Sequence, residues 1–263
     1  MSVTGKTEVK ALVLDRGIIF ADNSEPKQGV FEVSTTQEHL LGTELRFSDG
    51  RQYRYARAGA TALTKNLMCQ KGIDDADYNA EDQTGNFPVI GDTTIVVEVA
   101  TGLALIEDVN ELAGGVVVVN AGLDAGSIYN ITGSKFGTTD TNIALTIDSP
   151  IRITWDTTSN ITIVPNMWMN TLVHATTTTG SAVGVPNVDV PINNYYWSQT
   201  GGPCGLVCDA TETIGVGGPV GAPAAMAVAG RVGLNVTVTQ RWGNAMTAET
   251  TAAQVVPIWL TIL

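Results

Sequence analysis

The chain has 263 residues, of which 15% are charged and 6% aromatic, and its formal net charge is −12. Thr, Val, Ala and Gly dominate, which favours strands and turns and argues against long amphipathic helices. No apolar run approaches the roughly 18 residues of a membrane span, and residues 1–10 lack the apolar core of a signal peptide. We therefore expect a soluble protein that is made in a cytoplasm and has no membrane partner.

The charges are distributed unevenly along the chain. Residues 1–71 hold ten bases and eight acids, whereas residues 72–263 hold four bases and eighteen acids. This asymmetry argues against nucleic-acid binding and favours an N-terminal segment that docks on an acidic protein surface, such as that of a neighbouring copy. The alternative is that the acids only keep the surface soluble. We expect an extended N-terminal arm with a β-hairpin over 1–71 and a β-rich body over 72–263, two sub-sheets being one option.

The first quarter of the chain contains strand-like and helix-like patterns. Three apolar pieces are expected to be extended: residues 9–14, 17–20 and 29–33. Hydrophobic and charged residues alternate over 44–57 around the turn sequence Ser-Asp-Gly-Arg at 48–51, which predicts a β-hairpin. Residues 58–69 have a helix-like composition, although Gly59 and Asn66 limit its length.

The hairpin carries a group of candidate interface residues. Arg51, Arg54 and Arg57 accompany Tyr53 and Tyr55. Guanidinium groups and aromatic rings both bind nucleic acid, but no further basic residues extend this patch. We therefore prefer a side-chain ladder packed on another subunit, with no nucleic-acid partner.

An acidic stretch follows the hairpin at residues 72–85. The spacing of Asp75, Asp77 and Asn79 is similar to the start of a calcium loop. However, Ala80 stands where the loop needs glycine, and Asn86 where it needs the closing glutamate. We expect a solvated linker between arm and body, and no metal site.

Short strands alternate with turn residues from residue 93 to the C-terminus. Ten are expected: 93–99, 115–119, 127–132, 142–147, 151–155, 160–164, 167–174, 195–200, 234–239 and 255–263. Many short strands separated by Gly, Pro, Asn or Asp are typical of sandwiches and barrels. The sequence therefore predicts an all-β fold with a β-sandwich or barrel-like body, a jelly roll being one option.

The most distinctive stretch begins with the aromatic triplet at 195–197. These rings supply large buried area, so we expect Trp197 to anchor the core. From 216 to 233 almost every residue is small and apolar, which lets backbones approach closely and suits contacts between chains. We therefore add Trp197 and Ala225 to the candidate interface residues, with Ala225 near a three-fold axis.

The carboxylates and nucleophiles offer no recognisable catalytic motif. No GxSxG, HExxH or Walker sequence occurs, and no GxGxxG stands between a strand and a helix. Asp140, Asp148 and Asp156 are candidates for a glycosidase acid pair, but each lies beside a turn residue, where short acids belong for backbone reasons. We expect no enzyme activity, no catalytic residue and no cofactor.

Histidine and cysteine are scarce. His39 and His174 are the only histidines, and we expect each to be satisfied by a neighbour. Cys204 and Cys208 lie four residues apart, too far for a disulfide on an extended strand, with no second CxxC or nearby histidine for a metal. We expect structural thiols.

Several segments, taken in order, resemble a group of tailed-bacteriophage head proteins. They are 55–63, the Asn-Ala-Gly and Asp-Ala-Gly-Ser-Ile-Tyr-Asn-Ile-Thr-Gly segments within 120–133, then 183–186, 196–203, 229–232, 243–245 and 255–260. The resemblance implies a head decoration, or cement, protein on the outer capsid surface of a virion, commonly homotrimeric, with the major capsid protein as its partner. It brings no catalytic residues.

Two other classes remain open. A trimeric tail-fibre or receptor-binding module would share the β-rich character, but its aromatic and acidic residues should gather on tip loops to bind glycans. The five tryptophans here instead lie in or beside expected strands. A polysaccharide-degrading enzyme is disfavoured because the chain lacks repeats and a convincing acid pair.

Overall fold

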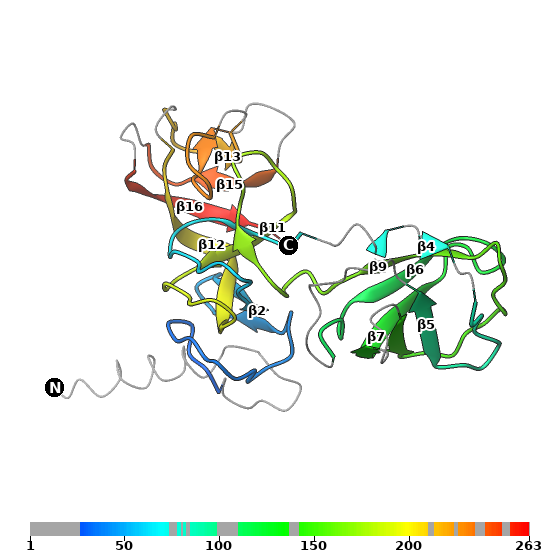
Figure 1. Cartoon of the computed structure of the whole chain (residues 1–263). Coiled ribbons are helices and arrows are strands. Elements are labelled where there is room, and N and C mark those ends of the chain that lie inside the picture. The colour runs from blue at the N-terminus through cyan, green and yellow to red at the C-terminus, as the bar shows by residue number, and fades with distance from the viewer. Residues whose placement is uncertain are drawn as a thin grey trace. The chain divides into compact units, whose positions relative to one another are not determined.

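The structure is a computed structural model that describes residues 27–73, 78–79, 81–82, 85–98, 110–136, 142–209, 213–223, 226–234, 240–248 and 253–262. These residues form an all-β fold with two antiparallel sheets, one of them curled into a half-barrel, as the sequence predicts (Figure 1). The chain divides into two compact units. The first contains the described residues up to Gly72 and those from Met167 onward, and the second contains residues Ile73–Asn166.

The first unit contains a ten-stranded sheet with β12 at its centre. Its strands are β1 (Glu44–Arg46), β2 (Gln52–Arg57), β3 (Cys69–Gln70), β10 (Leu172–Val173), β11 (Ala182–Pro186), β12 (Tyr195–Val207), β13 (Pro219–Gly221), β14 (Gly233–Leu234), β15 (Arg241–Ala245) and β16 (Val255–Thr261). The order is β10-β3-β11-β12-β16-β15-β13-β14, and the β1–β2 hairpin joins through β2. Because β12 is long enough to pair with β11, β2 and β16, it links the hairpin to the C-terminal strands.

The second unit contains a six-stranded sheet. Its strands are β4 (Glu81–Asp82), β5 (Thr94–Glu98), β6 (Val116–Ala121), β7 (Ile128–Phe136), β8 (Asn142–Ile147) and β9 (Asn160–Val164), in the order β4-β9-β6-β7-β8-β5. Along β6, β8 and β9 buried and exposed residues alternate, which buries one face of the sheet. That face surrounds a core of Val, Ile and Leu together with Tyr129 and Trp155.

The second unit is an insertion in the first. Strand β3 precedes it, β10 follows it, and these two strands pair directly, with Gln70 opposite Leu172. The expected boundary at residue 71 lies where the chain leaves the first unit, but the return at Met167 was not predicted. The hairpin, expected in a separate arm, is part of the first unit's sheet, because β2 pairs with β12 over six positions.

The expected elements compare unevenly with the observed strands. The hairpin is confirmed, and β8 and β9 have the predicted bounds. Residues 29–33 form a turn, 58–69 form no helix, and 151–155 are irregular. Of the expected strand 167–174 only Leu172–Val173 is extended. The expected pieces at 9–14 and 17–20 lie outside the described residues.

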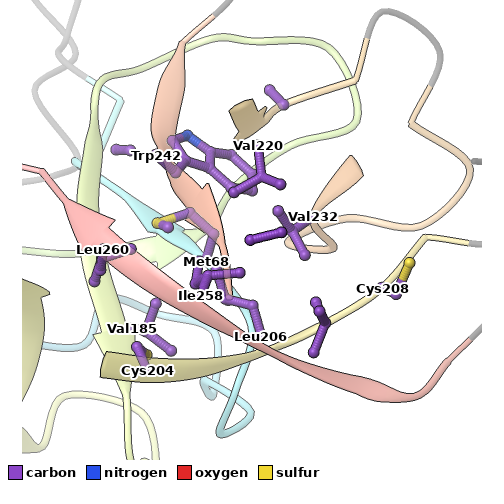
Figure 2. Packing of buried hydrophobic residues seen from close by; sticks show 14 of the residues in the cluster. Met68, Val185, Cys204, Leu206, Cys208, Val220, Val232, Trp242, Ile258 and Leu260 are labelled. Atoms are coloured by element: carbon purple, nitrogen blue, oxygen red, sulfur yellow. The ribbon is translucent and has the colours of Figure 1, made fainter. Parts of the chain in front are cut away.

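The core of the first unit lies under β12, β15 and β16. Figure 2 shows Leu206, Trp242 and Ile258 from these three strands converging with Val220 and Val232. The run Val-Val-Pro-Ile-Trp-Leu-Thr in β16 alternates between exposed and buried positions, so its even-numbered residues enter this core. Five buried members of the cluster come from the small-residue run at 216–233 or border it: Ile214, Val220, Ala222, Met226 and Val232.

A second cluster of the first unit joins β2 and β12. Tyr53, Tyr55 and Trp197 are fully enclosed together with Leu45. Gln28 connects the segment before the hairpin to this cluster: its carbonyl accepts the Trp197 Nε1 hydrogen at 2.8 Å, and its Oε1 accepts the Tyr55 hydroxyl at 2.7 Å. Residues from 27 onward therefore belong to the folded unit and are not a free arm.

Candidate interaction surface

Three predicted interface residues cannot contact another subunit directly. Tyr53, Tyr55 and Trp197 are no more than 1% exposed. This corrects their assignment to an interface, because the alternation in β2 buries the two tyrosine rings and leaves Gln52, Arg54 and Arg57 partly exposed. The expectation that Trp197 anchors a core is confirmed.

The three arginines of β2 and its turn are partly exposed, and each has partners within its own unit. The Arg51 Nε donates to Asp49 at 2.7 Å, and Arg54 Nη2 lies 3.2 Å from a Glu44 oxygen. The Arg57 guanidinium lies over an aromatic ring of β12, at 6.0 Å from the ring centre. Carboxylates therefore pair with Arg51 and Arg54, whereas the described contacts of Arg57 are with uncharged groups.

Ala225 lies outside the described residues. The described residues of the run at 216–233 are only partly consistent with a contact between chains. Val216 and Val228 are exposed, whereas Val220 and Val232 are buried in the unit's own core. Much of this small-residue run therefore packs within the chain.

The thiols and the two histidines have structural roles. Burial raises the pKa of Cys69 and Cys204 to about 12, and all three cysteines are buried thiols. Buried neutral thiols are unreactive. Burial lowers the pKa of His174, whose Nδ1 lies 2.8 Å from the carbonyl oxygen of Ala175 and whose ring packs edge-on against Trp242. The expectation for cysteine is confirmed. The expectation for His174 is met only in part, because its buried Nε2 has no hydrogen-bond partner among the described residues.

His39 packs on the aromatic cluster of the first unit. Its ring lies 5.1 Å from that of Tyr55 and 5.3 Å from that of Trp197. Burial lowers the pKa of His39, Lys27 lowers it further, and Glu38 opposes the shift. The neutral ring thus serves as a packing group.

The described candidate acids stabilise the backbone. Asp148 accepts two hydrogen bonds from Asn130, and Asp156 accepts the Thr158 amide and hydroxyl. These bonds hold the pKa of both carboxyls below the usual range. The turn-like roles expected for them are confirmed, while Asp140 lies outside the described residues.

A buried carboxylate organises the loop between β6 and β7. Asp124 accepts hydrogen bonds from the Ser127 hydroxyl at 2.6 Å, the Tyr129 hydroxyl at 2.6 Å and Trp155 Nε1 at 3.1 Å. Burial opposes its ionisation, but these bonds outweigh that effect and keep its pKa below the usual range. The network explains the Asp-x-x-Ser-x-Tyr spacing as a structural device.

No three His, Cys, Asp or Glu side chains of the described residues are grouped as metal ligands. Asp75 and Asp77 lie outside the described residues, and the Oδ1 atom of Asn79 accepts a 3.3 Å bond from Thr162. Nor does the described part of the chain contain a helix long and apolar enough to cross a membrane.

The strongest candidate site is an apolar strip on the outer face of β12, β15 and β16. Trp259, 45% exposed, lies at its centre between Pro203 on β12 and Asn244 on β15. We define the outer strip by nine residues: Pro203, Gly205, Val207, Asn244, Met246, Val255, Pro257, Trp259 and Thr261. The sequence contained the signal, because the alternation in β16 places Val255, Pro257 and Trp259 on the face opposite the core.

The outer strip has the properties of a protein contact. None of its nine residues is ionisable, and Val255, Trp259 and Met246 are each at least 45% exposed. Gly205 has no side chain and the two prolines have compact ones, so the surface of the strip is flat around Trp259. Gly50 of the hairpin turn lies against the edge of the Trp259 ring. Interface centres are depleted in charge and enriched in aromatic residues and Met.

Comparison with known proteins finds no matching family model, no matching curated protein and no matching solved structure.

Proposed function

We propose that this chain is a structural, non-enzymatic component of a larger protein assembly, and that it binds its partner through the outer strip. The observation that carries the proposal is a largely apolar surface, centred on Trp259 and without an ionisable residue among its nine members, on the central strands of the ten-stranded sheet. The catalytic alternative lacks comparable support, since the described histidines, thiols and candidate acids have structural partners.

The finer proposal is a decoration protein on the outside of a tailed-phage head. It is supported by the ordered resemblance of the sequence to that group and is consistent with the all-β architecture. The partners are then the major capsid protein and further copies of this chain in a homotrimer. A cement protein must hold shell subunits together, and the outer strip is suited to such a contact because none of its nine residues is ionisable. The Arg241 guanidinium donates to the side chain of Asn244 in the strip at 2.6 Å.

Co-sedimentation with purified heads of the phage whose genome encodes the chain tests this function. Wild-type protein should bind to saturation, whereas Trp259→Glu, which places a charge at the centre of the strip, should lose binding while keeping its circular dichroism spectrum. Ile192→Glu is the matched control, because Ile192 is an exposed apolar residue of the first unit outside the strip. Failure of the wild-type protein to bind, or unchanged binding by Trp259→Glu, would contradict the proposal.

A glycan-binding module is the second candidate, and the exposed Trp259 ring is the observation that favours it. Sugar rings pack their apolar faces on such aromatic surfaces. However, the other four tryptophans are buried, at 7% exposure or less. Saturable quenching of Trp259 fluorescence by surface oligosaccharides of the host, absent in Trp259→Phe, would support this candidate.

A further inference from the structure

The whole net charge of the chain resides on the inserted second unit. Residues 73–166 hold fourteen of the 26 acids and only two bases, Lys135 and Arg152, so their formal charge is −12. The remaining residues hold twelve acids and twelve bases and are neutral. A unit with this charge repels anionic surfaces and the same unit of another copy, and it attracts cationic partners.

Three exposed aliphatic side chains gather on this acidic unit. Val89, Ile90 and Ile153 are 50%, 67% and 43% exposed. Their segments lie side by side, because the Ile90 amide donates to Thr154 Oγ1 at 3.3 Å and the Trp155 amide donates to the Pro88 carbonyl at 3.1 Å. We call Val89, Ile90 and Ile153 the Ile90 surface.

Backbone hydrogen bonds hold the Ile90 surface in place. The Gly91 amide donates to the Ile151 carbonyl at 3.0 Å, and the Ile151 amide donates to the Asp92 carbonyl at 2.8 Å. Ile151 itself is buried in the core of the unit. The exposed aliphatic residues are therefore presented in a defined geometry, as a docking surface requires.

A shallow depression adjoins the Ile90 surface. Phe87, Pro88 and Val96 contribute its apolar lining, and Asp92 is the only ionisable residue among those that line it. One carboxylate oxygen of Asp92 accepts the Val89 amide at 2.8 Å, which fixes the orientation of the group. Asn86, Thr93 and Thr94 line the depression beside these apolar residues. A recess of such mixed character with one fixed carboxylate suits a Lys or Arg side chain, which has an apolar stem and a cationic head.

We propose that the Ile90 surface and its depression bind a protein segment that combines aliphatic side chains with Lys or Arg. The aliphatic residues of the partner pack on Val89, Ile90 and Ile153, a cationic side chain enters the depression toward Asp92, and the charge of the unit attracts the segment. Contact with a second copy through this site is opposed by two charges of −12. This inference is independent of the outer strip, which belongs to the neutral first unit.

Binding of synthetic peptides to the full chain tests the proposal. The probes are an amphipathic Leu/Lys peptide, a Leu/Glu peptide with the same apolar face, and a Ser/Lys peptide with the same charge. The Leu/Lys peptide should bind best. Ile90→Ser and Ile153→Ser should each weaken its binding by about tenfold, the effect of losing roughly two buried methylene groups. Ile192→Ser, on the first unit, is the matched control and should bind like the wild-type protein.

Four results would overturn the proposal. Equal affinity of wild-type protein and Ile90→Ser for the Leu/Lys peptide would show that charge alone attracts it, as would equal affinity for the Ser/Lys peptide. A change in sedimentation coefficient in Ile90→Ser would assign the surface to a second copy. Binding of the wild-type protein, but not Ile90→Ser, to neutral phosphatidylcholine vesicles would assign it to a membrane.

Discussion

Trp197 and Trp259 belong to strands of the same sheet, but the first packs in the core and the second is exposed and available for binding. Trp197 on β12 is 1% exposed and joins the cluster around Tyr55, whereas Trp259 on β16 is 45% exposed and lies between Pro203 and Asn244. Their opposite roles follow from which face of the sheet each occupies.

Replacing each ring by alanine should therefore give different results. Trp197→Ala removes a buried ring and the hydrogen bond to the Gln28 carbonyl, and it should lower the free energy of unfolding by about 3–5 kcal/mol. Trp259→Ala should change it by about 0.5 kcal/mol or less, because the ring is a surface group. Urea denaturation followed by circular dichroism measures both. Similar losses in the two variants would place Trp259 in the core and remove the outer strip.

Asp124 should contribute strongly to the stability of the second unit. Asp124→Ala leaves the buried Tyr129 hydroxyl and Trp155 Nε1 without their acceptor, which should cost roughly 3 kcal/mol. Asp156→Ala is the control: it removes a carboxylate that bonds only to the nearby Thr158, and should cost about 1 kcal/mol or less. Denaturation curves compare the two variants. An equal loss of unfolding free energy in the two variants would show that the hydrogen bonds around Asp124 do not act as a cooperative network.

At the residue scale, the sequence predicted which ring anchors the core better than it predicted which residues meet another chain. The aromatic triplet at 195–197 predicted a core anchor, and Trp197 is one. Tyr53 and Tyr55 were instead assigned with the neighbouring arginines to a ladder packed on another subunit, because an alternating strand has two faces and the sequence alone does not show which one meets the core. Burial became evident only from the pairing of β2 with β12.

At the scale of elements, the predicted strands were those with β-branched alternation. The bounds of β8 and β9 follow directly from runs of Ile, Leu, Thr and Val. By contrast β11, β13 and β15 contain Gly or Pro, residues that disfavour strands, and were not predicted. They are strands because neighbouring backbones approach closely where no side chain intervenes.

Gly243 on β15 shows this close approach most clearly. A methyl group there would overlap the carbonyl oxygen of Trp259, which β16 places directly beside it. Gly243→Ala should therefore force β15 and β16 apart and lower the free energy of unfolding by roughly 1–3 kcal/mol. Gly215→Ala is the matched control, since nothing lies within 4 Å of the added group. Thermal unfolding compares the two, and an equally stable Gly243→Ala would show that the strands do not pair as described.

At the scale of the whole molecule, the insertion of one unit into another also confines the histidines to one unit. Both histidines belong to the first unit, and residues 73–166 contain none. The boundary near residue 71 was visible as a change in charge. The return at Met167 was not, because the pairing of β3 with β10 joins residues about one hundred positions apart and leaves no local signal.

The two units should consequently lose stability in different pH ranges. Folding lowers the pKa of His39 and His174, so each stays neutral in the folded state while the unfolded chain takes up a proton. The contribution of the two neutral histidines to the free energy of unfolding is complete above pH 6.5, the ordinary pKa of histidine. It declines as the pH falls from there toward the pKa of the folded state. The carboxyls with lowered pKa in the second unit lose their contribution to the free energy of unfolding only when the pH falls below about 3.8.

Hydrogen exchange at pH 7.5 and pH 5, corrected for the intrinsic exchange rate, should therefore show weakened protection in the first unit and unchanged protection in the second. His39→Gln should restore part of the protection that the first unit loses at pH 5. Equal weakening of both units would mean that the two histidines do not control acid sensitivity.

A cryo-EM reconstruction of the assembled particle would show whether this chain decorates the head. We expect density for this chain on the outer surface of the head, with Trp259 and the rest of the outer strip buried against a shell subunit or a neighbouring copy. An outer strip that faces solvent in every copy, or a head without this chain, would contradict this expectation.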